Sequence, residues 1–194
     1  MRPIDGGLFH KARKKDVPCA YEPKANGHRA LVHVPTMQCW NRHGQRMTNE
    51  RDYGNALDLI HAECNNVIEW LDCEFMGRRT EVMKGCIIIL DCPSLHYLTY
   101  KDRKSSIKYI GFNDTPISED ECSCVSLIPS VSSYEEGIEL WNDLPKFNKR
   151  LGNTNPQTQL WEGIVVKEMD SRYRIQTHRD DVESPEWVKH RMRY

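Results

Sequence analysis

The sequence predicts an α+β fold in which antiparallel sheets are flanked by helices. Two observations carry this prediction. Short runs of apolar and β-branched residues, each bounded by turn residues, recur along the chain and are typical of strands. Two longer segments instead repeat their apolar residues at helical spacing. We expect a single domain over residues 1–194, because 194 residues support one substantial core.

The expected strands are short. Residues 30–34 and 37–40 predict a hairpin around Pro35 and Thr36. Apolar runs predict further strands over residues 66–75, 86–90 and 162–168. The acidic segment 111–124 predicts a loop.

Two helices are expected between these strands. The first spans residues 49–64, with Asn49 as its cap. Its predicted buried face consists of Tyr53, Ala56, Leu57, Ile60 and Cys64. The second opens at Ser133 and Glu136, which match a capping box, and we expect Pro145 to end or kink it.

Composition limits the class of protein. The net charge of −1 excludes a globally basic nucleic-acid binder. No apolar run approaches the roughly 20 residues that span a bilayer, and no hydrophobic stretch follows the basic N-terminus. None of the eight cysteines forms a Cys-x-x-Cys pair, and Cys122 and Cys124 are too isolated to specify a zinc site. We therefore expect an intracellular, cytoplasmic protein with free, buried thiols.

Charge is unevenly distributed along the chain. A basic cluster precedes the first predicted strand and could follow a phosphate backbone: Lys11, Arg13, Lys14 and Lys15. Arginines also gather near the C-terminus, where acidic residues dilute them: Arg172, Arg174, Arg179, Arg191 and Arg193. For these arginines, phosphate binding and an ordinary solvated surface both remain open.

The segment 22–29, Glu-Pro-Lys-Ala-Asn-Gly-His-Arg, contains a candidate nucleophile. Lys24 can attack phosphorus only as a neutral amine, so it needs nearby cations such as Arg29 or desolvation to lower its pKa. Gly27 permits a close approach of backbone to a nucleotide, and Glu22 can accept from a base or a ribose. The alternative is a turn between strands with solvated charges.

Four further motifs follow in order: Trp-Leu-Asp-Cys-Glu-Phe at 70–75, Ile-Ile-Ile-Leu-Asp at 87–91, Trp-Glu-Gly-Ile-Val-Val-Lys at 161–167 and Trp-Val-Lys-His-Arg at 187–191. With segment 22–29, this series resembles the covalent nucleotidyltransferases, which comprise polynucleotide ligases and mRNA-capping guanylyltransferases. The Asp-Ser-x-Tyr run at 170–173 is most similar to ATP-dependent DNA ligases. The resemblance implies the ATP-grasp-like nucleotidyltransferase (adenylation) domain, acting with ATP and Mg²⁺, or Mn²⁺ in its place.

The resemblance also implies site residues. The catalytic lysines would be Lys24, Lys167 and Lys189, the last two neutralising the α-phosphate. The nucleotide would contact Glu22, Pro23, Arg29, Glu74, Leu90, Val165, Lys167 and Lys189. Glu162 and Glu74 would lie near the metal. Nucleic acid would contact Arg42 and Arg191 together with Lys11, Arg13, Lys14 and Lys15. Asp72 would support Glu74, and Asp91 with Arg103 would form a structural ion pair or cap beside the pocket.

Four positions depart from the family pattern. Asn26 and Cys73 replace an aspartate and a glycine, and we expect Cys73 to add bulk at the pocket wall. Leu90 stands where an aromatic residue stacks on adenine, so stacking is weaker or is supplied elsewhere. Arg191 replaces a second lysine, which keeps the charge but changes its geometry.

The implied function is a DNA ligase core for repair or replication that seals 5′-phosphate/3′-hydroxyl nicks through a lysyl-AMP intermediate. An oligonucleotide-binding (OB) barrel usually follows in the family, and we expect none here, so duplex binding would need a separate OB-fold or DNA-binding partner or the chain's own basic surface. A monomer is expected. The alternatives are an RNA ligase, a GTP-using capping guanylyltransferase and a non-catalytic nucleic-acid-binding module.

Overall fold

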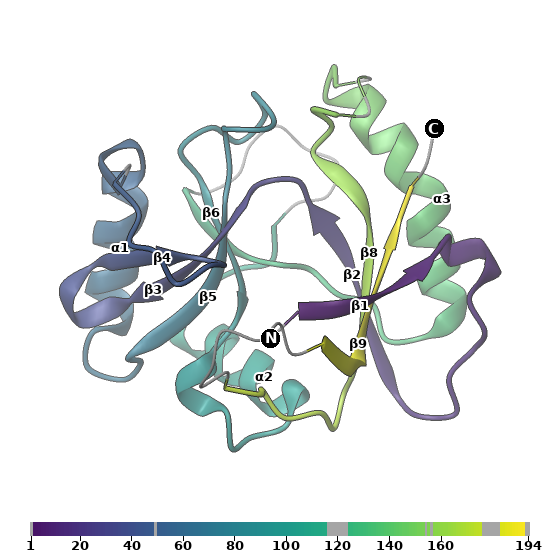
Figure 1. The fold of residues 1–194 in the computed structure, drawn as a ribbon, viewed down its shortest axis with the longest axis horizontal. Coiled ribbons are helices and arrows are strands. Elements are labelled where there is room, and N and C mark those ends of the chain that lie inside the picture. The colour runs from purple at the N-terminus through teal and green to yellow at the C-terminus, as the bar shows by residue number, and fades with distance from the viewer. Residues whose placement is uncertain are drawn as a thin grey trace.

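The computed structural model describes residues 2–48, 50–115, 124–153, 155, 157–175 and 183–192. Two open sheets form its centre (Figure 1). Sheet A has the order β1-β9-β8-β2, and sheet B has the order β4-β3-β5-β6-β7. The strands are β1 (Arg2–Gly7), β2 (Cys19–Ala25), β3 (His28–His33), β4 (Gln38–Asn41), β5 (Trp70–Phe75), β6 (Ile87–Asp91), β7 (Val125–Leu127), β8 (Trp161–Glu168) and β9 (Glu183–Arg191).

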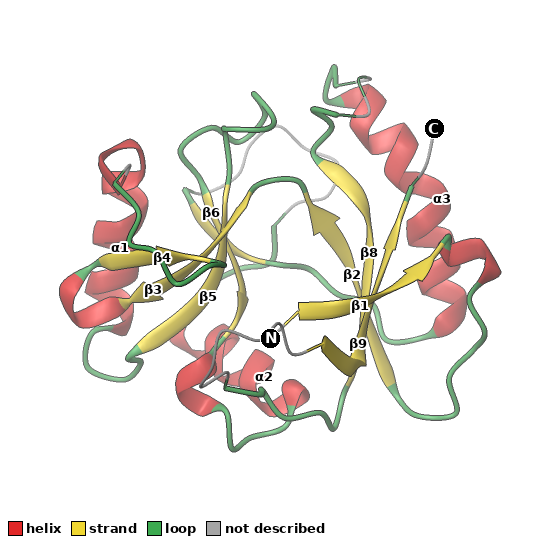
Figure 2. Cartoon of the chain, in the orientation of Figure 1, coloured by secondary structure: helices red, strands yellow, loops and turns green. Residues whose placement is uncertain are grey.

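Three α-helices accompany the sheets: α1 (Gly54–Cys64), α2 (Tyr100–Ile110) and α3 (Tyr134–Arg150). The helices α1 and α3 lie at opposite outer sides of the two sheets, and α2 lies below and between them (Figure 2). Pairing is antiparallel except between β1 and β9 and between β6 and β7. The predicted α+β class with helix-flanked, mainly antiparallel sheets is confirmed, and neither described sheet closes into a barrel.

Each sheet buries its outer face against its helix. On sheet A, Tyr21, Ile164 and Val166 join Trp141 and Leu144 of α3 in one core. On sheet B, alternate residues of β3 and β5 pack with the apolar face of α1: Ala30, Val32, Leu71, Cys73 and Phe75. Because strand side chains alternate between faces, the remaining residues of β2, β3, β5 and β8 occupy the inner faces. Those inner faces carry most of the charged motif residues.

Sheet A continues into sheet B through the candidate nucleophile segment. Only Asn26 and Gly27 separate β2 from β3. A Cβ atom on Gly27 would lie 2.5 Å from the carbonyl oxygen of Phe75 and 2.8 Å from Cγ of Glu74. The close approach of β5 therefore requires glycine at position 27, independently of any contact with a nucleotide.

Several predicted elements are confirmed with changed limits. The hairpin of β3 and β4 forms, with Met37 in the left-handed region at φ 55°. The first helix buries its predicted face, but α1 begins at Gly54, after a 3₁₀ turn over Glu50–Tyr53. The proposed cap Asn49 lies outside the described residues. Strand β5 starts at Trp70 rather than at 66, because the N–H groups of Val67 and Ile68 still bond to Cys64 at the helix end.

Of the two outcomes expected at Pro145, an end or a kink, the end of the second helix is wrong. The capping box of Ser133 and Glu136 opens α3 as expected, and the helix then continues to Arg150. Proline removes one backbone hydrogen bond at a cost of about 3 kcal/mol. The turns after it still bury Asn148, whose side-chain amide bonds to the carbonyl and N–H of Trp161. These tertiary contacts favour the continued helix.

The strands β1, β2, β7 and β9 and the helix α2 were not predicted. Thr99 caps α2 by accepting from the N–H of Asp102. The described cysteines are free, and five of them are buried: Cys19, Cys39, Cys64, Cys73 and Cys92. Cys122 and residues 116–123 of the predicted acidic loop lie outside the described residues. No helix in the described part of the chain is long and apolar enough to cross a membrane.

Candidate active site around Lys24

Lys24 lies near the end of β2 and forms an ion pair with Glu162 of β8. The two strands pair with Lys24 opposite Gly163 and Ala25 opposite Trp161, so Glu162 is an extra residue on β8. Trp161 and Ile164 both belong to the core of sheet A, although three positions separate them. This bulge turns Glu162 out of the regular alternation and toward Lys24. Their side chains are 20% and 17% exposed, so solvent can still reach the pair.

Two cations of β9 adjoin this pair. Arg191 lies opposite Gly163 in the sheet, and its Nε is 3.6 Å from Oε1 of Glu162. Lys189 lies two residues earlier, opposite Val165, and on the same face. Burial lowers the pKa of Lys189, and the charges of Arg191, Arg2 and Lys24 lower it further against the opposing effect of Asp5. A Cβ atom on Gly163 would lie 1.9 Å from the carbonyl oxygen of His190, so only glycine fits between Lys24 and Arg191.

Glu74 brings a second carboxylate from sheet B. Its Oε1 accepts a hydrogen bond of 3.0 Å from the N–H of Gly27. Burial raises the pKa of Glu74 to about 7, against the opposing charges of Lys24 and Arg29, and Asp72 raises it further. Glu162 and Glu74 thus both lie close to Lys24, and their predicted role near a metal stays a prediction.

The raised pKa of Glu74 predicts a pH dependence of stability. Between the usual glutamate pKa of 4.5 and about 7, the folded state binds the Glu74 proton more tightly than the unfolded state does. The free energy of unfolding from this group must therefore fall as pH rises through that window. We expect Glu74→Gln to remove about 1–3 kcal/mol of that fall between pH 5 and pH 8, measured by urea unfolding. Equal pH profiles for wild type and variant would contradict the assignment.

Glu22 is more deeply enclosed than the sequence indicated. Its carboxylate is 2% exposed and accepts from Tyr100 Oη and Lys104 Nζ of α2, the latter at 3.2 Å. Lys167 Nζ lies 2.9 Å from the second oxygen. The carboxylate is therefore fully engaged within the protein. Its predicted contact with a base or ribose would require one of these partners to leave.

Lys167 occupies the same buried cluster. Its ammonium is held between Glu22 and the carbonyl oxygen of Leu90, at 3.1 Å from the latter. The rings of Tyr100 and Trp187 lie 4.7 Å and 4.4 Å from it. At 3% exposure, the group stabilises Glu22 and the contact between β8 and β6. Its predicted contact with an α-phosphate stays a prediction and requires this ion pair to open.

Arg29 of β3 forms an ion pair with Asp72 of the neighbouring strand β5 rather than pointing to Lys24. Its guanidinium holds both oxygens of Asp72, with Nε at 2.8 Å from Oδ1. Tyr173 Oη donates to Asp72 at 3.0 Å, and burial raises the pKa of this phenol, helped by the adjacent carboxylate. Arg29 is therefore the cation beside the carboxylates Asp72 and Glu74 of β5. Beside these residues, the predicted ion pair of Arg103 with Asp91 is confirmed, with Nε 2.7 Å from Oδ1.

Cys73, Pro23, Leu90 and Val165 complete the predicted pocket positions. The expectation that Cys73 lines the pocket is wrong, because the alternation of β5 places it in the core beneath α1. Pro23 lies opposite Ile164, on the core-facing side of sheet A. Val165 lies opposite Glu22, on the inner face with Lys24. Leu90 is partly buried and packs against the core of sheet A.

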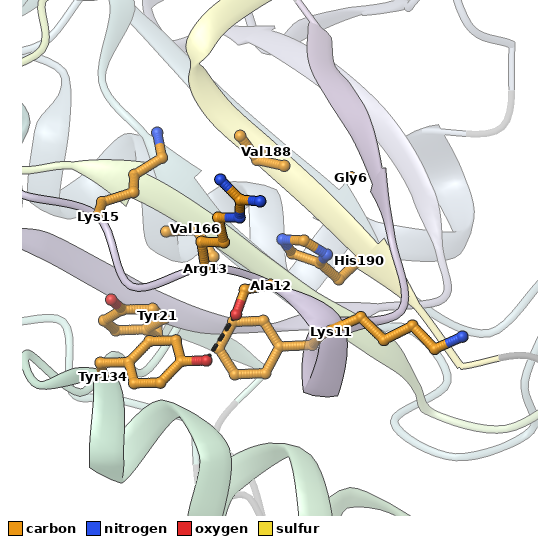
Figure 3. A pocket seen from close by; sticks show the side chains of 11 residues that line it. Gly6, Lys11, Ala12, Arg13, Lys15, Tyr21, Tyr134, Val166, Val188 and His190 are labelled. Carbon is orange, nitrogen blue, oxygen red and sulfur yellow. Dashed lines mark hydrogen bonds between the residues drawn. The ribbon is translucent and has the colours of Figure 1, made fainter.

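The basic cluster lies on the other face of sheet A (Figure 3). Lys11, Arg13 and Lys15 line a hollow of about 270 Å³ whose wall includes Tyr21 and His190. Tyr21 faces away from Glu22 and Lys24 on β2, so the sheet separates this hollow from the candidate nucleophile. Lys14 and Lys15 pair with Glu135 and Glu168. Arg42 is exposed on the turn after β4, where its Nε donates to His43.

Solved structures with this arrangement of sheets are known. The ligase domain from M. tuberculosis LigD has a TM-score of 0.63 over 98% of this chain and 59% of its own, at 18% identity. Mycobacterial DNA ligase D complexed with ATP and MES has a TM-score of 0.63 over 97% of this chain and 58% of its own, also at 18% sequence identity. The chain has the fold of a ligase nucleotidyltransferase domain. An archaeal ATP-dependent RNA ligase is also similar to this domain, with 0.57 over 98% and 47% at 14% identity.

The chain spans a little more than half the length of the mycobacterial ligase structures. Neither protein-family profiles nor curated sequences match the chain. Lys104 was not predicted as a site residue, and Tyr100 was not expected to contact Glu22. A lysine and a tyrosine four residues apart on an otherwise polar helix face were the available signal, since such residues share a face.

Proposed function

We propose that the chain is the adenylation domain of an ATP-dependent polynucleotide ligase, with Lys24 as the nucleophile that carries AMP. The observation that supports this most is the contact of Lys24 with Glu162 at the bulge of β8, surrounded by Glu74, Lys189 and Arg191. The bulge of β8 turns Glu162 toward Lys24, and the close strand packing at Gly27 and Gly163 brings Glu74 and Arg191 next to the pair. The similarity to ligase catalytic domains agrees with the proposal.

The proposed reaction begins with the neutral amine of Lys24. Its nitrogen attacks the α-phosphorus of ATP, the bond to the bridging oxygen breaks, and pyrophosphate leaves with the electron pair. Glu162 orients the amine, and Lys189 and Arg191 oppose the negative charge that accumulates on the phosphate oxygens. AMP then passes to a 5′-phosphate, and a 3′-hydroxyl displaces it to form the phosphodiester bond.

Mg²⁺, when bound, shields the phosphates and stabilises the departing pyrophosphate. Among the described residues, no group of three or more His, Cys, Asp or Glu side chains is arranged to hold a metal. Mg²⁺ commonly takes only one or two protein carboxylates and completes its coordination with phosphates and water. Glu162 and Glu74 fit this kind of site, since both carboxylates adjoin Lys24.

DNA is the proposed nucleic acid, and an RNA ligase is the second candidate. Asn26 departs from the aspartate usual in DNA ligases, but its amide donates to the carbonyls of Gln157 and Gln159 at 3.1 Å and 3.0 Å. An aspartate could not donate to either, so local hydrogen bonding accounts for Asn26 without reference to RNA. Sealing assays on matched nicked DNA and nicked RNA distinguish the two substrates.

Incubation with radiolabelled ATP or GTP and Mg²⁺, followed by denaturing electrophoresis, tests the proposal. A ligase becomes covalently labelled by ATP. Labelling by GTP alone would indicate a capping guanylyltransferase, and absence of labelling by either nucleotide would contradict nucleotidyl transfer and favour a binding module.

The separation of the basic cluster from Lys24 predicts separable functions. Lys11 and Arg13 contact no carboxylate among the described residues, so they are the cations of the cluster available for phosphates. We expect the double variant Lys11→Ala with Arg13→Ala to bind nicked duplex more weakly. The slope of log binding constant against log salt concentration should become shallower by about 2, because each lost phosphate contact contributes about 0.9. Self-adenylation should stay near the wild-type rate.

Lys14→Ala is the matched control, because this exposed lysine is paired with Glu135. It should change binding and slope less than the double variant. An equal loss of adenylation and binding in a folded double variant would show that the hollow supports the nucleotide site and would contradict the division of roles.

A further inference from the structure

Three aromatic side chains from three strands meet on the inner face of sheet B. His33 lies opposite Trp70, and Leu31, two residues before His33, lies opposite Trp40. The ring centroid of Trp70 is 4.7 Å from that of His33 and 5.2 Å from that of Trp40. We call His33, Trp40 and Trp70 the aromatic platform. It shares its sheet face with Arg29 and Glu74, so it continues the surface of the candidate active site.

The aromatic platform belongs to neither hydrophobic core. Trp40 and Trp70 are only partly buried, whereas the other tryptophans, Trp141, Trp161 and Trp187, are at most 8% exposed. Partly exposed indole rings gathered on one face are uncommon on a protein surface without a partner. The cluster therefore indicates a binding surface.

The charged residues near the aromatic platform indicate which kind of partner binds it. From Ala25 to Asn49 the chain contains no aspartate or glutamate, although acidic residues make up 28 of its 194 positions. The same segment contains three arginines, of which Arg29 is bound by Asp72, whereas Arg42 and Arg46 belong to the turn after Trp40. The turn that follows Trp40 thus presents cations beside the rings. Glu69, 3.6 Å from His33, is the carboxylate paired with the aromatic platform.

We propose that the aromatic platform stacks on unpaired bases of a polynucleotide strand whose phosphates contact Arg42 and the turn after β4. Aromatic rings next to cations are the usual combination for single-stranded nucleic acid, because every base offers a π-face. In a duplex, neighbouring bases cover those faces, so stacking needs unpaired bases. This inference rests on the proposed function and adds to it a binding site for unpaired bases of the polynucleotide, separate from the ends that are joined.

Titration of intrinsic tryptophan fluorescence tests the inference, because stacked bases quench indole emission and the other three tryptophans are buried. The probes are a fully paired nicked duplex and the same duplex with a short single-stranded gap. We expect quenching and tighter binding with the gapped probe. Trp40→Leu and Trp70→Leu should each abolish part of the quenching and weaken binding to the gapped probe about tenfold. Trp→Phe at either position should retain most of the affinity.

Tyr109→Ala is the matched control, because this aromatic residue is 94% exposed on α2, away from the aromatic platform. It should leave both probes unaffected. Unchanged affinity of the Leu variants for the gapped probe would overturn the inference, as would equal quenching by both probes. If the wild-type protein forms a dimer that the Leu variants lose while they still bind nucleic acid, the aromatic platform contacts a second copy of the chain. That result would also overturn the inference. Covalent labelling by ATP should persist in every variant and reports on the proposed function separately.

Discussion

Lys24→Ala should abolish covalent labelling by ATP. The proposed intermediate is a phosphoramidate between Nζ of Lys24 and AMP, which is labile in acid and resistant to base. Among the lysines nearby, Lys167 is enclosed with Glu22, and Lys189 lies on β9, opposite Val165 rather than beside the bulge that holds Glu162 against Lys24. The measurement is labelling with radiolabelled ATP, followed by acid and base treatment of the denatured protein.

Lys24→Arg tests the chemistry rather than the charge. It retains a cation beside Glu162, but a guanidinium stays protonated and cannot attack phosphorus. We expect labelling to be lost as completely as in Lys24→Ala while folding is preserved. Lys14→Arg, on the far side of sheet A, serves as the control and should label normally. Labelling that survives in either variant would show that the nucleophile is another residue.

Arg103→Met should destabilise the fold by about 3–5 kcal/mol, because it leaves the buried carboxylate of Asp91 without its cation. Arg103 is fully buried and also donates to the carbonyls of Leu98 and Ser171 at 2.7 Å and 3.2 Å. It therefore joins α2 to β6 and to the chain after β8. The free energy of unfolding in urea gives the measurement.

A second substitution separates charge from packing. Asp91→Asn in the Arg103→Met background removes the unpaired charge. In the wild type, Oδ1 of Asp91 accepts a hydrogen bond of 2.7 Å from the N–H of Cys92, and the amide oxygen of asparagine can still accept it. We expect part of the lost stability to return. Lys146→Met, which breaks an exposed pair with Asp143, should cost less than about 1 kcal/mol. A cost for Arg103→Met as small as that of Lys146→Met would contradict a stabilising role for the buried pair.

The sequence allowed prediction of those candidate site residues that are recognised by residue type at short spacing. Lys24 and Gly27 lie within one segment, and Glu162 opens a run with strand periodicity. Local sequence determines such features, since they depend on the pitch of one strand or helix. The ion pair of Arg103 with Asp91 was also predicted, but it joins α2 to β6, so its formation depends on how these two elements pack.

The sequence by itself determined the α+β class, the hairpin of β3 and β4, the buried face of α1 and the identity of the candidate nucleophile. Only the tertiary structure decided the partners of each charge: Glu22 with Lys104 and Lys167, Arg29 with Asp72, and Lys24 with Glu162. It also decided that Cys73 packs in the core and that the basic cluster lies behind sheet A. The reason is register: pairing between distant strands sets which side chains meet, and a single bulged residue changes the face.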